Sequence, residues 1–289
     1  MAEPTYAQPE LLAEPDWLES VRDDPTVRVI DCTRARERPW ASIPGAAALP
    51  AHFSLKDPAD PLHVIGPQPF AELMGRLGVS PETTVVAYDR HSGMAAARLW
   101  WVLSYYGHER AKVLNGGWHR WRAEQRPLAS RPSEPVPARF TPRPNEAVLA
   151  RMDYVRERLA DGTAQILDVR NAAERAEPSP WGNRYGGVIP GALHWEWSDT
   201  LSADEQRRFR PAAELWAHLR AAGVAPEKEV ITHCQAGIRS ALMAFVLSLL
   251  GLERVRTYDA SMKEWANTDG APLVPAPATA PPDPRPARP

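Results

Sequence analysis

The chain contains little cysteine: Cys32 and Cys234 are the two thiols among its 289 residues. So few cysteines exclude a disulfide-stapled scaffold. Because no Cys-x-x-Cys pair is present, a cysteine-based zinc site is not expected either. The sequence implies no metal and no organic cofactor.

The chain also lacks long apolar runs and an excess of charge. Its longest apolar run, 241–250, contains a serine and is too short for a bilayer, which takes about 20 residues. Residues 1–18 carry acids and prolines where a signal peptide needs an apolar core. With 34 basic and 36 acidic residues, the net charge of −2 predicts no broad affinity for nucleic acid or membranes. We therefore expect a cytoplasmic protein with reduced thiols.

Proline is the residue in excess, at 31 of 289 residues, about 11% where about 5% is usual. Residues 127–144 hold 6 of these prolines and residues 271–289 hold 8. We interpret the first stretch as a stiff linker and the second as a disordered Pro/Ala-rich tail. Outside them the chain divides into two bodies, 1–126 and 145–270, each long enough to bury a core.

The two bodies repeat one another. The letters IPGA stand at 43–46 and again at 189–192. Three further pairs of segments match in the same order along the chain: 29–31 with 166–168, 84–89 with 229–234, and 113–118 with 257–262. An ordered set of shared landmarks predicts a tandem duplication.

Short apolar runs alternate with stretches of helical periodicity in each copy. For the second copy the predicted strands are 165–169, 229–233 and 254–258. The predicted helices are 150–160, 211–222 and 239–250. Such alternation is typical of βαβ units. Each body is therefore predicted to be an α/β domain with a parallel sheet flanked by helices.

Cys234 stands at a favourable place in this scheme. It follows the predicted strand 229–233 and opens a loop with small Ala236 and Gly237 before the next helix. Ligands bind beyond the carboxyl ends of parallel strands, and there loop amides and a helix N-terminus form a nest for an anion. Such surroundings lower the pKa of a thiol and make it nucleophilic, and Arg239 adds a positive charge.

The length of this loop separates two chemistries. Cysteine phosphatases and some arsenate reductases carry His-Cys-x5-Arg, which wraps a phosphate, whereas four residues separate Cys234 from Arg239. The shorter loop, GGVIPGA at 186–192 and the YDxSxxEW segment at 258–265 resemble tandem-domain rhodaneses. These are the thiosulfate and 3-mercaptopyruvate sulfurtransferases.

The resemblance spans roughly residues 15–270 and implies two tandem rhodanese-like domains, the first catalytically inactive. Asp89 stands in the first copy where Cys234 stands in the second, and a carboxylate cannot carry sulfur. The family's chemistry implies that the Cys234 thiolate takes the outer sulfur of a donor as a persulfide. It then passes that sulfur to a thiophilic acceptor such as cyanide, a thiol or thioredoxin.

The resemblance also assigns roles around the thiol. The loop residues that would stabilise the persulfide charge are Gln235, Ala236, Gly237, Ile238 and Arg239. Arg184 and Arg239 fall where an anionic substrate is bound. Arg170 is expected to pair with a carboxylate such as Glu174 or Asp168, as part of the scaffold.

Several other side chains are interpreted as packing residues. His233 is expected to point into the sheet or the domain interface, and residues 195–197 are expected to pack in the core. Cys32 aligns with Val169 within a strand and is expected to be an inert buried thiol. The family usually has Gly-Ser/Gly-Trp where 260–262 reads Ala-Ser-Met, and we treat that departure as a packing difference.

The composition of the loop bears on the sulfur donor. Mercaptopyruvate enzymes typically carry Cys-Gly-Ser/Thr-Gly-Val-Thr, whose hydroxyls can assist protonation of the leaving enolate. Here Gln235 and Ala236 stand in those places and the loop ends in Arg239, which favours the dianion thiosulfate over the alternative, 3-mercaptopyruvate. Two further hypotheses are a phosphatase or arsenate reductase, and a non-enzymatic sulfur carrier whose Pro-rich tail docks a partner.

Overall fold

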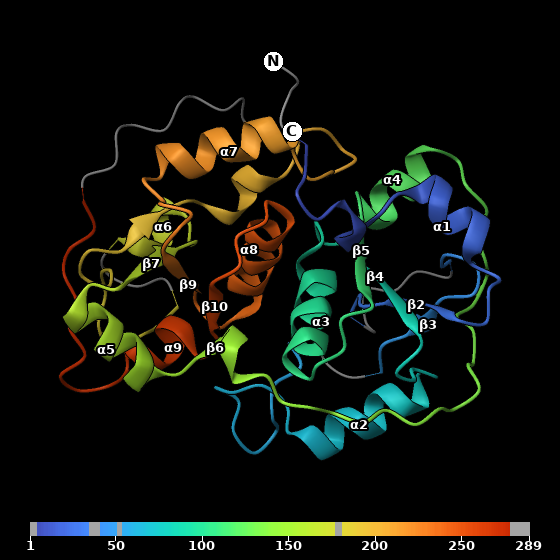
Figure 1. Cartoon of the computed structure of the whole chain (residues 1–289), viewed down its shortest axis with the longest axis horizontal. Helices are drawn as coiled ribbons and strands as arrows, with labels where there is room; N and C mark the ends of the chain where they lie inside the picture. Colours follow the sequence, from blue (N-terminus) through green and yellow to red (C-terminus); the bar gives the residue numbers. More distant parts are fainter. Residues whose placement is uncertain (1–4, 35–40, 51–53, 177–180, 278–289) are drawn as a thin grey trace.

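The computed structural model describes residues 5–34, 41–50, 54–176 and 181–277. Within these ranges the chain forms two α/β domains of the same design, seen side by side in Figure 1. Each contains a five-stranded sheet, with strand orders β1-β5-β4-β2-β3 and β6-β10-β9-β7-β8, and every strand pair is parallel. The matching orders confirm the predicted duplication and the predicted parallel sheets.

The strands are short and follow one another in the same sequence in both sheets. The first sheet contains β1 (Leu12–Ala13), β2 (Val27–Asp31), β3 (Ala47–Ala48), β4 (Thr84–Tyr88) and β5 (Ala111–Leu114). The second contains β6 (Leu149–Ala150), β7 (Ala164–Asp168), β8 (Leu193–His194), β9 (Glu229–His233) and β10 (Val255–Tyr258). The central strands are rich in β-branched residues and buried on both faces, as parallel sheets under helices require.

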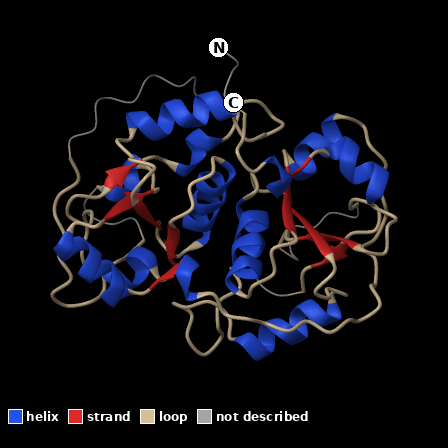
Figure 2. Cartoon of the chain, in the orientation of Figure 1, coloured by secondary structure: helices blue, strands red, loops and turns tan. Residues whose placement is uncertain are grey.

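Helices alternate with these strands (Figure 2). The N-terminal domain contains α1 (Pro15–Val21), α2 (Pro67–Arg76), α3 (Met94–Tyr105) and α4 (Gly117–Ala123). The C-terminal domain contains α5 (Met152–Asp161), α6 (Ala172–Arg175), α7 (Ala212–Ala221), α8 (Ile238–Leu249) and α9 (Ser261–Trp265). Every strand and helix predicted for the second copy is present, with ends within two residues of the prediction.

One of the buried hydrophobic clusters is shared by the two domains. Helices α3 and α8 pack against each other between the two sheets, and the buried cluster around them extends through both domains. Nearly every residue of both helices is buried, so the apolar run 241–250 is explained by burial between the domains. No helix in the described part of the chain is both long and apolar enough to cross a membrane.

Both proline-rich segments are attached to the domains. In the predicted linker 127–144, Ala129 exchanges two backbone hydrogen bonds of 2.9 Å with Ser42, and Phe140 packs edge-on against Phe70. The linker therefore runs along the N-terminal domain.

The prediction of a disordered tail over 271–289 is wrong for its first residues. Val274 exchanges backbone hydrogen bonds of 2.9 and 3.0 Å with Val188, and the buried Trp265 indole donates to the Pro272 carbonyl. An indole N–H in the core needs an acceptor, which this segment supplies. Residues 278–289 lie outside the described residues.

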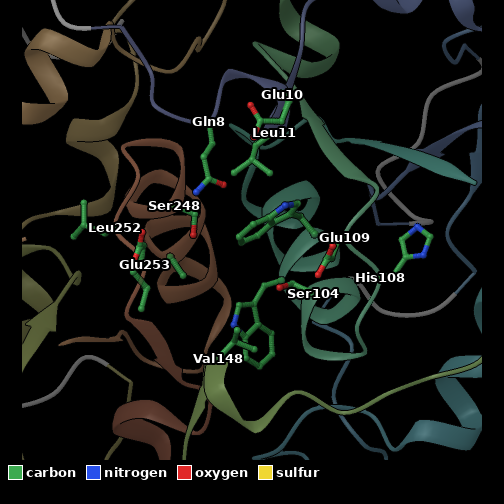
Figure 3. A pocket seen from close by; sticks show the side chains of 14 residues that line it. Gln8, Glu10, Leu11, Ser104, His108, Glu109, Val148, Ser248, Leu252 and Glu253 are labelled. Atoms are coloured by element: carbon green, nitrogen blue, oxygen red, sulfur yellow. The ribbon is translucent and has the colours of Figure 1, made fainter. Parts of the chain in front are cut away.

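A cavity of about 380 Å³ lies near the C-terminal ends of α3 and α8. Figure 3 shows Ser104 and Ser248 in its wall, with Glu10, Glu109 and Glu253 around it. Because α8 begins next to Cys234 and this cavity lies at the other end of the helix, it is separate from the thiol site.

The shared core predicts a large cost for truncating Phe245 of α8. Its ring is fully buried and meets Trp100 of α3 edge-on at 5.0 Å between centroids. Phe245→Ala should lower the free energy of unfolding by about 3–5 kcal/mol, measured by urea denaturation. The control Val136→Ala, at a side chain 82% exposed, should stay within about 0.5 kcal/mol of the parent. Equal stability of the two variants would contradict a core shared between the domains.

Candidate active site

Cys234 lies at the junction of β9 and α8, on the carboxyl edge of the C-terminal sheet. The strand ends at His233, and Gly237 caps the helix with φ at +87°. Glycine adopts this left-handed conformation without steric cost, so the chain turns from strand to helix within a few residues. The cysteine is 1% exposed, so its sulfur is held inside this turn.

Hydrogen-bonding groups surround the Cys234 sulfur. The Gly237 amide donates to Sγ at 3.2 Å, and Ser240 Oγ lies 3.8 Å from the same atom. Backbone hydrogen bonds from Ala236 and Ser240 also lower the pKa of the thiol. The first turn of a helix has unpaired amides and a positive dipole end, and here both face the sulfur. The turn is therefore a nest for an anionic sulfur.

The thiol is acidified in spite of its burial. Burial acts to raise the pKa of Cys234, but the charge of Arg239 and the loop amides outweigh it and hold that pKa below its ordinary value. The thiolate is the nucleophilic form of cysteine. A buried thiol of this kind is therefore suited to covalent catalysis, whereas an ordinary buried cysteine is not.

Arg239 is held in place by Glu174. Its two terminal nitrogens donate to the two carboxylate oxygens at 2.5 and 2.7 Å. Glu174 is fixed in turn by a capping box with Asn171 and by the Trp181 indole at 2.6 Å. Burial acts to lower the pKa of Arg239, but Glu174 and the Cys234 thiolate hold it above its ordinary value. The guanidinium is thus a permanent charge beside the sulfur.

The segment after β10 holds the loop from behind. The Cys234 amide donates to Ser261 Oγ at 3.1 Å, and that hydroxyl donates to a backbone carbonyl at the end of β10. The amides of Met262 and Lys263 donate to the carbonyls of Cys234 and Gln235. Ser261 has φ at +54°, a costly conformation for a residue other than glycine, so these contacts offset local strain.

Asp259 fills the space under the Cys234 loop. A Cβ atom placed on Gly237 would lie 2.3 Å from Asp259 Oδ1 and 2.4 Å from the Asp259 carbonyl oxygen. Glycine is therefore needed at 237 for room as well as for its backbone angle. The close fit makes the position of the Gly237 amide depend on the position of Asp259.

The corresponding loop of the N-terminal domain is occupied by its own carboxylate. Asp89 follows β4 as Cys234 follows β9. Its Oδ1 accepts from the amides of His91 and Gly93, and its Oδ2 accepts from Ala95 and Ala96, all at 2.6–3.0 Å. The first copy thus keeps the anion nest and satisfies it with a side chain that cannot carry sulfur.

The predicted loop residues differ in what they contact. The Gln235 side chain exchanges two hydrogen bonds with Asn183, at 2.8 and 3.2 Å, which ties the loop to the segment before GGVIPGA. Arg184 is 57% exposed and pairs with Asp269 at 2.6 Å. Its described contacts lie with Asp269, Asn267 and Tyr185 at the surface, so the structure brings Arg239 to the sulfur and leaves Arg184 outside.

Of the residues predicted to be scaffold or to pack in the core, Arg170, His233 and Trp195 are buried, whereas Glu196 and Trp197 are half-buried. Arg170 pairs with Asp168, one of the two expected carboxylates, at 2.7 Å. His233 is fully buried 4.0 Å from Asp168, and burial lowers its pKa to about 4, so the ring is neutral at neutral pH. Trp195 is buried and stacks on His218. These buried side chains take part in the packing of the C-terminal domain.

The other thiol lies in the N-terminal domain. Cys32 is buried as expected, but it lies just beyond the end of β2 instead of within a strand, and its Sγ lies 3.8 Å from the Ile30 carbonyl. Within the described ranges, no group of three or more His, Cys, Asp or Glu side chains is placed to hold a metal ion.

Sequence reasoning missed Ser240 and Asp259 and treated Ser261 as a packing residue. The duplication contained a signal for Asp259, because the aligned residue of the first copy is the neutral Asn115. A carboxylate at a buried position of one copy implies a cation nearby, and Asp259 pairs with two cations of the other domain, Lys56 and Arg98.

The comparisons with known proteins agree with this architecture. A family model described as Rhodanese-like domain matches residues 14–124 and again 151–268. The chain is 34% identical over 282 residues to the sulfur carrier protein TtuD of Thermus thermophilus, with 93% of this chain and 98% of the relative covered. It is 33% identical over 273 residues to a thiosulfate sulfurtransferase of Azotobacter vinelandii, with the same coverage.

Solved structures share the fold. The 3-mercaptopyruvate sulfotransferase SseA of Escherichia coli matches with a TM-score of 0.78 and 28% identity, covering 87% of this chain and 98% of that one. A structure of EanB with ergothioneine matches with a TM-score of 0.84 at 22% identity, covering 94% of this chain and 71% of that one. The second likeness concerns the fold alone.

The crowding at Gly237 predicts a specific effect of adding one methyl group. Gly237→Ala should strain the backbone, displace Asp259 and move the amide away from Sγ, which raises the pKa of the Cys234 thiol. Alkylation of Cys234 by iodoacetamide at neutral pH should therefore slow.

Gly162→Ala is the matched control, because Gly162 also has positive φ (+66°) but no atom within 4 Å of its added Cβ. It should cost about 1 kcal/mol of stability from strain alone and leave the alkylation profile unchanged. Identical alkylation profiles in both variants would show that the Gly237 amide does not stabilise the thiolate.

Proposed function

Since the chain belongs to the rhodanese-like family and is a sulfurtransferase, we propose that it moves a sulfane sulfur from thiosulfate to a thiophilic acceptor through a persulfide on Cys234. The observation that carries this proposal is the nest around Sγ. It combines an acidified thiol, amide donors and the fixed charge of Arg239.

The first half of the reaction forms the persulfide. The Cys234 thiolate attacks the outer sulfur of thiosulfate, a new S–S bond forms, and the S–S bond of the donor breaks. The electron pair of the broken bond leaves with sulfite. The negative charge then lies on the outer sulfur of Cys234, where the loop amides and the helix N-terminus stabilise it.

The second half regenerates the thiolate. A nucleophilic acceptor such as cyanide or a thiol attacks the outer sulfur and forms a bond to it, while the electron pair of the Cys234 S–S bond returns to Sγ. Because the nest offers the same donors to thiolate and persulfide, the enzyme holds the anion through both halves. The reaction needs a reduced thiol, which supports a reducing compartment such as the cytoplasm.

Two arginines serve the anionic donor in this proposal. Arg239 offsets the charge brought together when a thiolate meets a dianion. Arg184 contributes from the rim, since its exposed ion pair with Asp269 is worth about 0–1 kcal/mol and is easily exchanged for a donor anion. The N-terminal copy transfers no sulfur, because Asp89 occupies its nest.

3-Mercaptopyruvate is the second candidate donor. Its organic fragment leaves as an enolate that requires a proton, and the Ser240 hydroxyl lies 3.8 Å from Sγ. The described loop is too short for the phosphatase alternative, which wraps a tetrahedral phosphate. A sulfur carrier would also form the persulfide on Cys234. It would differ from the proposed enzyme in not releasing product repeatedly.

Mass spectrometry of the Cys234 peptide tests the proposal. After incubation with thiosulfate the peptide should gain the mass of one sulfur atom, and cyanide should remove it with release of thiocyanate. Cys234→Ser should abolish both, whereas Cys32→Ser should behave as the parent.

The comparison of donors completes the experiment. If thiosulfate loads Cys234 faster than 3-mercaptopyruvate does, thiosulfate is supported as the donor. If 3-mercaptopyruvate loads it faster, 3-mercaptopyruvate becomes the proposed donor. Loading without repeated thiocyanate release would indicate a carrier. Thiocyanate production by Cys234→Ser would overturn the proposed function.

A further inference from the structure

Two cations of the N-terminal domain reach under the Cys234 loop. Arg98 of α3 is fully buried and donates to Asp259 Oδ1 at 2.6 Å. Lys56 Nζ lies 2.8 Å from Asp259 Oδ2 and donates to the Asp259 carbonyl at 2.9 Å and to the Leu62 carbonyl at 2.7 Å. Both carboxylate oxygens of Asp259 thus face a cation from the other domain.

These contacts lead to the sulfur in two steps. Asp259 packs directly under Gly237, leaving no space for a Cβ atom there. Gly237 in turn donates its amide to Cys234 Sγ at 3.2 Å. Because each contact is close, the position of Asp259 fixes the position of the donor that the sulfur uses.

Among the buried groups of this cluster the charges do not balance without the cysteine; the Asp60 carboxylate, which Lys56 also stabilises, is 55% exposed to water. Arg98 and Lys56 contribute two positive charges, whereas Asp259 contributes one negative charge, and both cations are nearly inaccessible to water. Arg239 near the sulfur is already paired with Glu174. Burying an unpaired charge is costly, so the surplus positive charge is relieved when Cys234 is a thiolate or a persulfide.

The charges of Lys56 and Cys234 interact. Burial lowers the pKa of Lys56 to about 8; Asp259 and the Cys234 thiolate act to raise it, and Arg98 acts to lower it. Coupling between two charged sites is reciprocal. A charged Lys56 therefore favours the thiolate form of Cys234.

We propose that Lys56 is a positioning residue of the Cys234 site, supplied by the N-terminal domain. It shares Asp259 with Arg98, holds that carboxylate against Gly237, and leaves one positive charge for the sulfur anion. This inference rests on the proposed function, because it takes Cys234 as the nucleophile. It gives the domain without a reactive thiol a direct part in the reaction.

Lys56→Met is the first test variant. It should raise the pKa of the Cys234 thiol, read from the pH dependence of iodoacetamide alkylation of the Cys234 peptide. It should also lower kcat for thiocyanate formation about tenfold or more, since small displacements of reacting groups cost up to about 10²-fold.

Lys112→Met is the matched control. Lys112 is also a lysine of the N-terminal domain that donates to a carbonyl, that of Glu10, and it lies over the Trp17 ring away from the loop. It should leave both the alkylation profile and kcat unchanged.

Asp259→Asn separates charge from general disruption. It should also lower kcat, because the carboxylate under Gly237 is lost, yet it should lower the thiol pKa, because two cations then face the sulfur. Opposite shifts in Lys56→Met and Asp259→Asn support the proposal, and shifts in the same direction overturn it. A parental profile and kcat in Lys56→Met also overturn it.

Two further results keep the test decisive. If circular dichroism shows that Lys56→Met does not fold, Lys56→Arg is measured instead. A Cys234 pKa equal to that of the parent in Lys56→Arg supports the role of the charge, and a raised Cys234 pKa overturns the proposal. Parental behaviour of Lys56→Met together with loss of sulfur uptake in Cys234→Ser overturns this inference alone. If the parent takes up no sulfur, the proposed function fails, while the alkylation profiles still decide the role of Lys56.

Discussion

The burial of an anionic sulfur governs the rest of this structure. Cys234 is 1% exposed, and a buried anion is stable only where fixed donors and charges replace water. The fold supplies them through the N-terminus of α8, which begins after Gly237 at positive φ. Asp259 packs so closely under Gly237 that a side chain there has no room. The donors are already oriented before any substrate binds, which is the condition for electrostatic stabilisation of a reacting anion.

Duplication explains how the two domains divide this task. Both copies keep the strand–turn–helix nest, but the first fills it with the Asp89 carboxylate and the second with the Cys234 sulfur. The packing of α3 against α8 brings Arg98 within reach of Asp259. The N-terminal domain thus contributes a charged side chain to the surroundings of the Cys234 loop, and the shared core fixes the position of the two domains relative to each other.

The sequence was informative where chemistry is local in the chain. The repeat landmarks and the βαβ alternation predict both domains, and the small-residue loop after Cys234 indicates the thiol that we propose as nucleophile, because each pattern depends on neighbours within a few residues. Lys56 could not be found this way, since its partner Asp259 lies in the other domain. The predicted start of the tail was wrong for a similar reason. The proline content of a segment does not reveal that its Pro272 carbonyl accepts a hydrogen bond from the buried Trp265 indole.

The route of a single sulfur atom distinguishes transfer through Cys234 from transfer by any other path. Thiosulfate carrying an isotopic label in its outer sulfur should give, in one turnover, a labelled persulfide on Cys234 and unlabelled sulfite. Cyanide should then yield labelled thiocyanate at a rate that accounts for steady-state turnover. Labelled thiocyanate formed without passage of the label through Cys234, or label recovered in sulfite, would show that Cys234 does not carry the transferred sulfur.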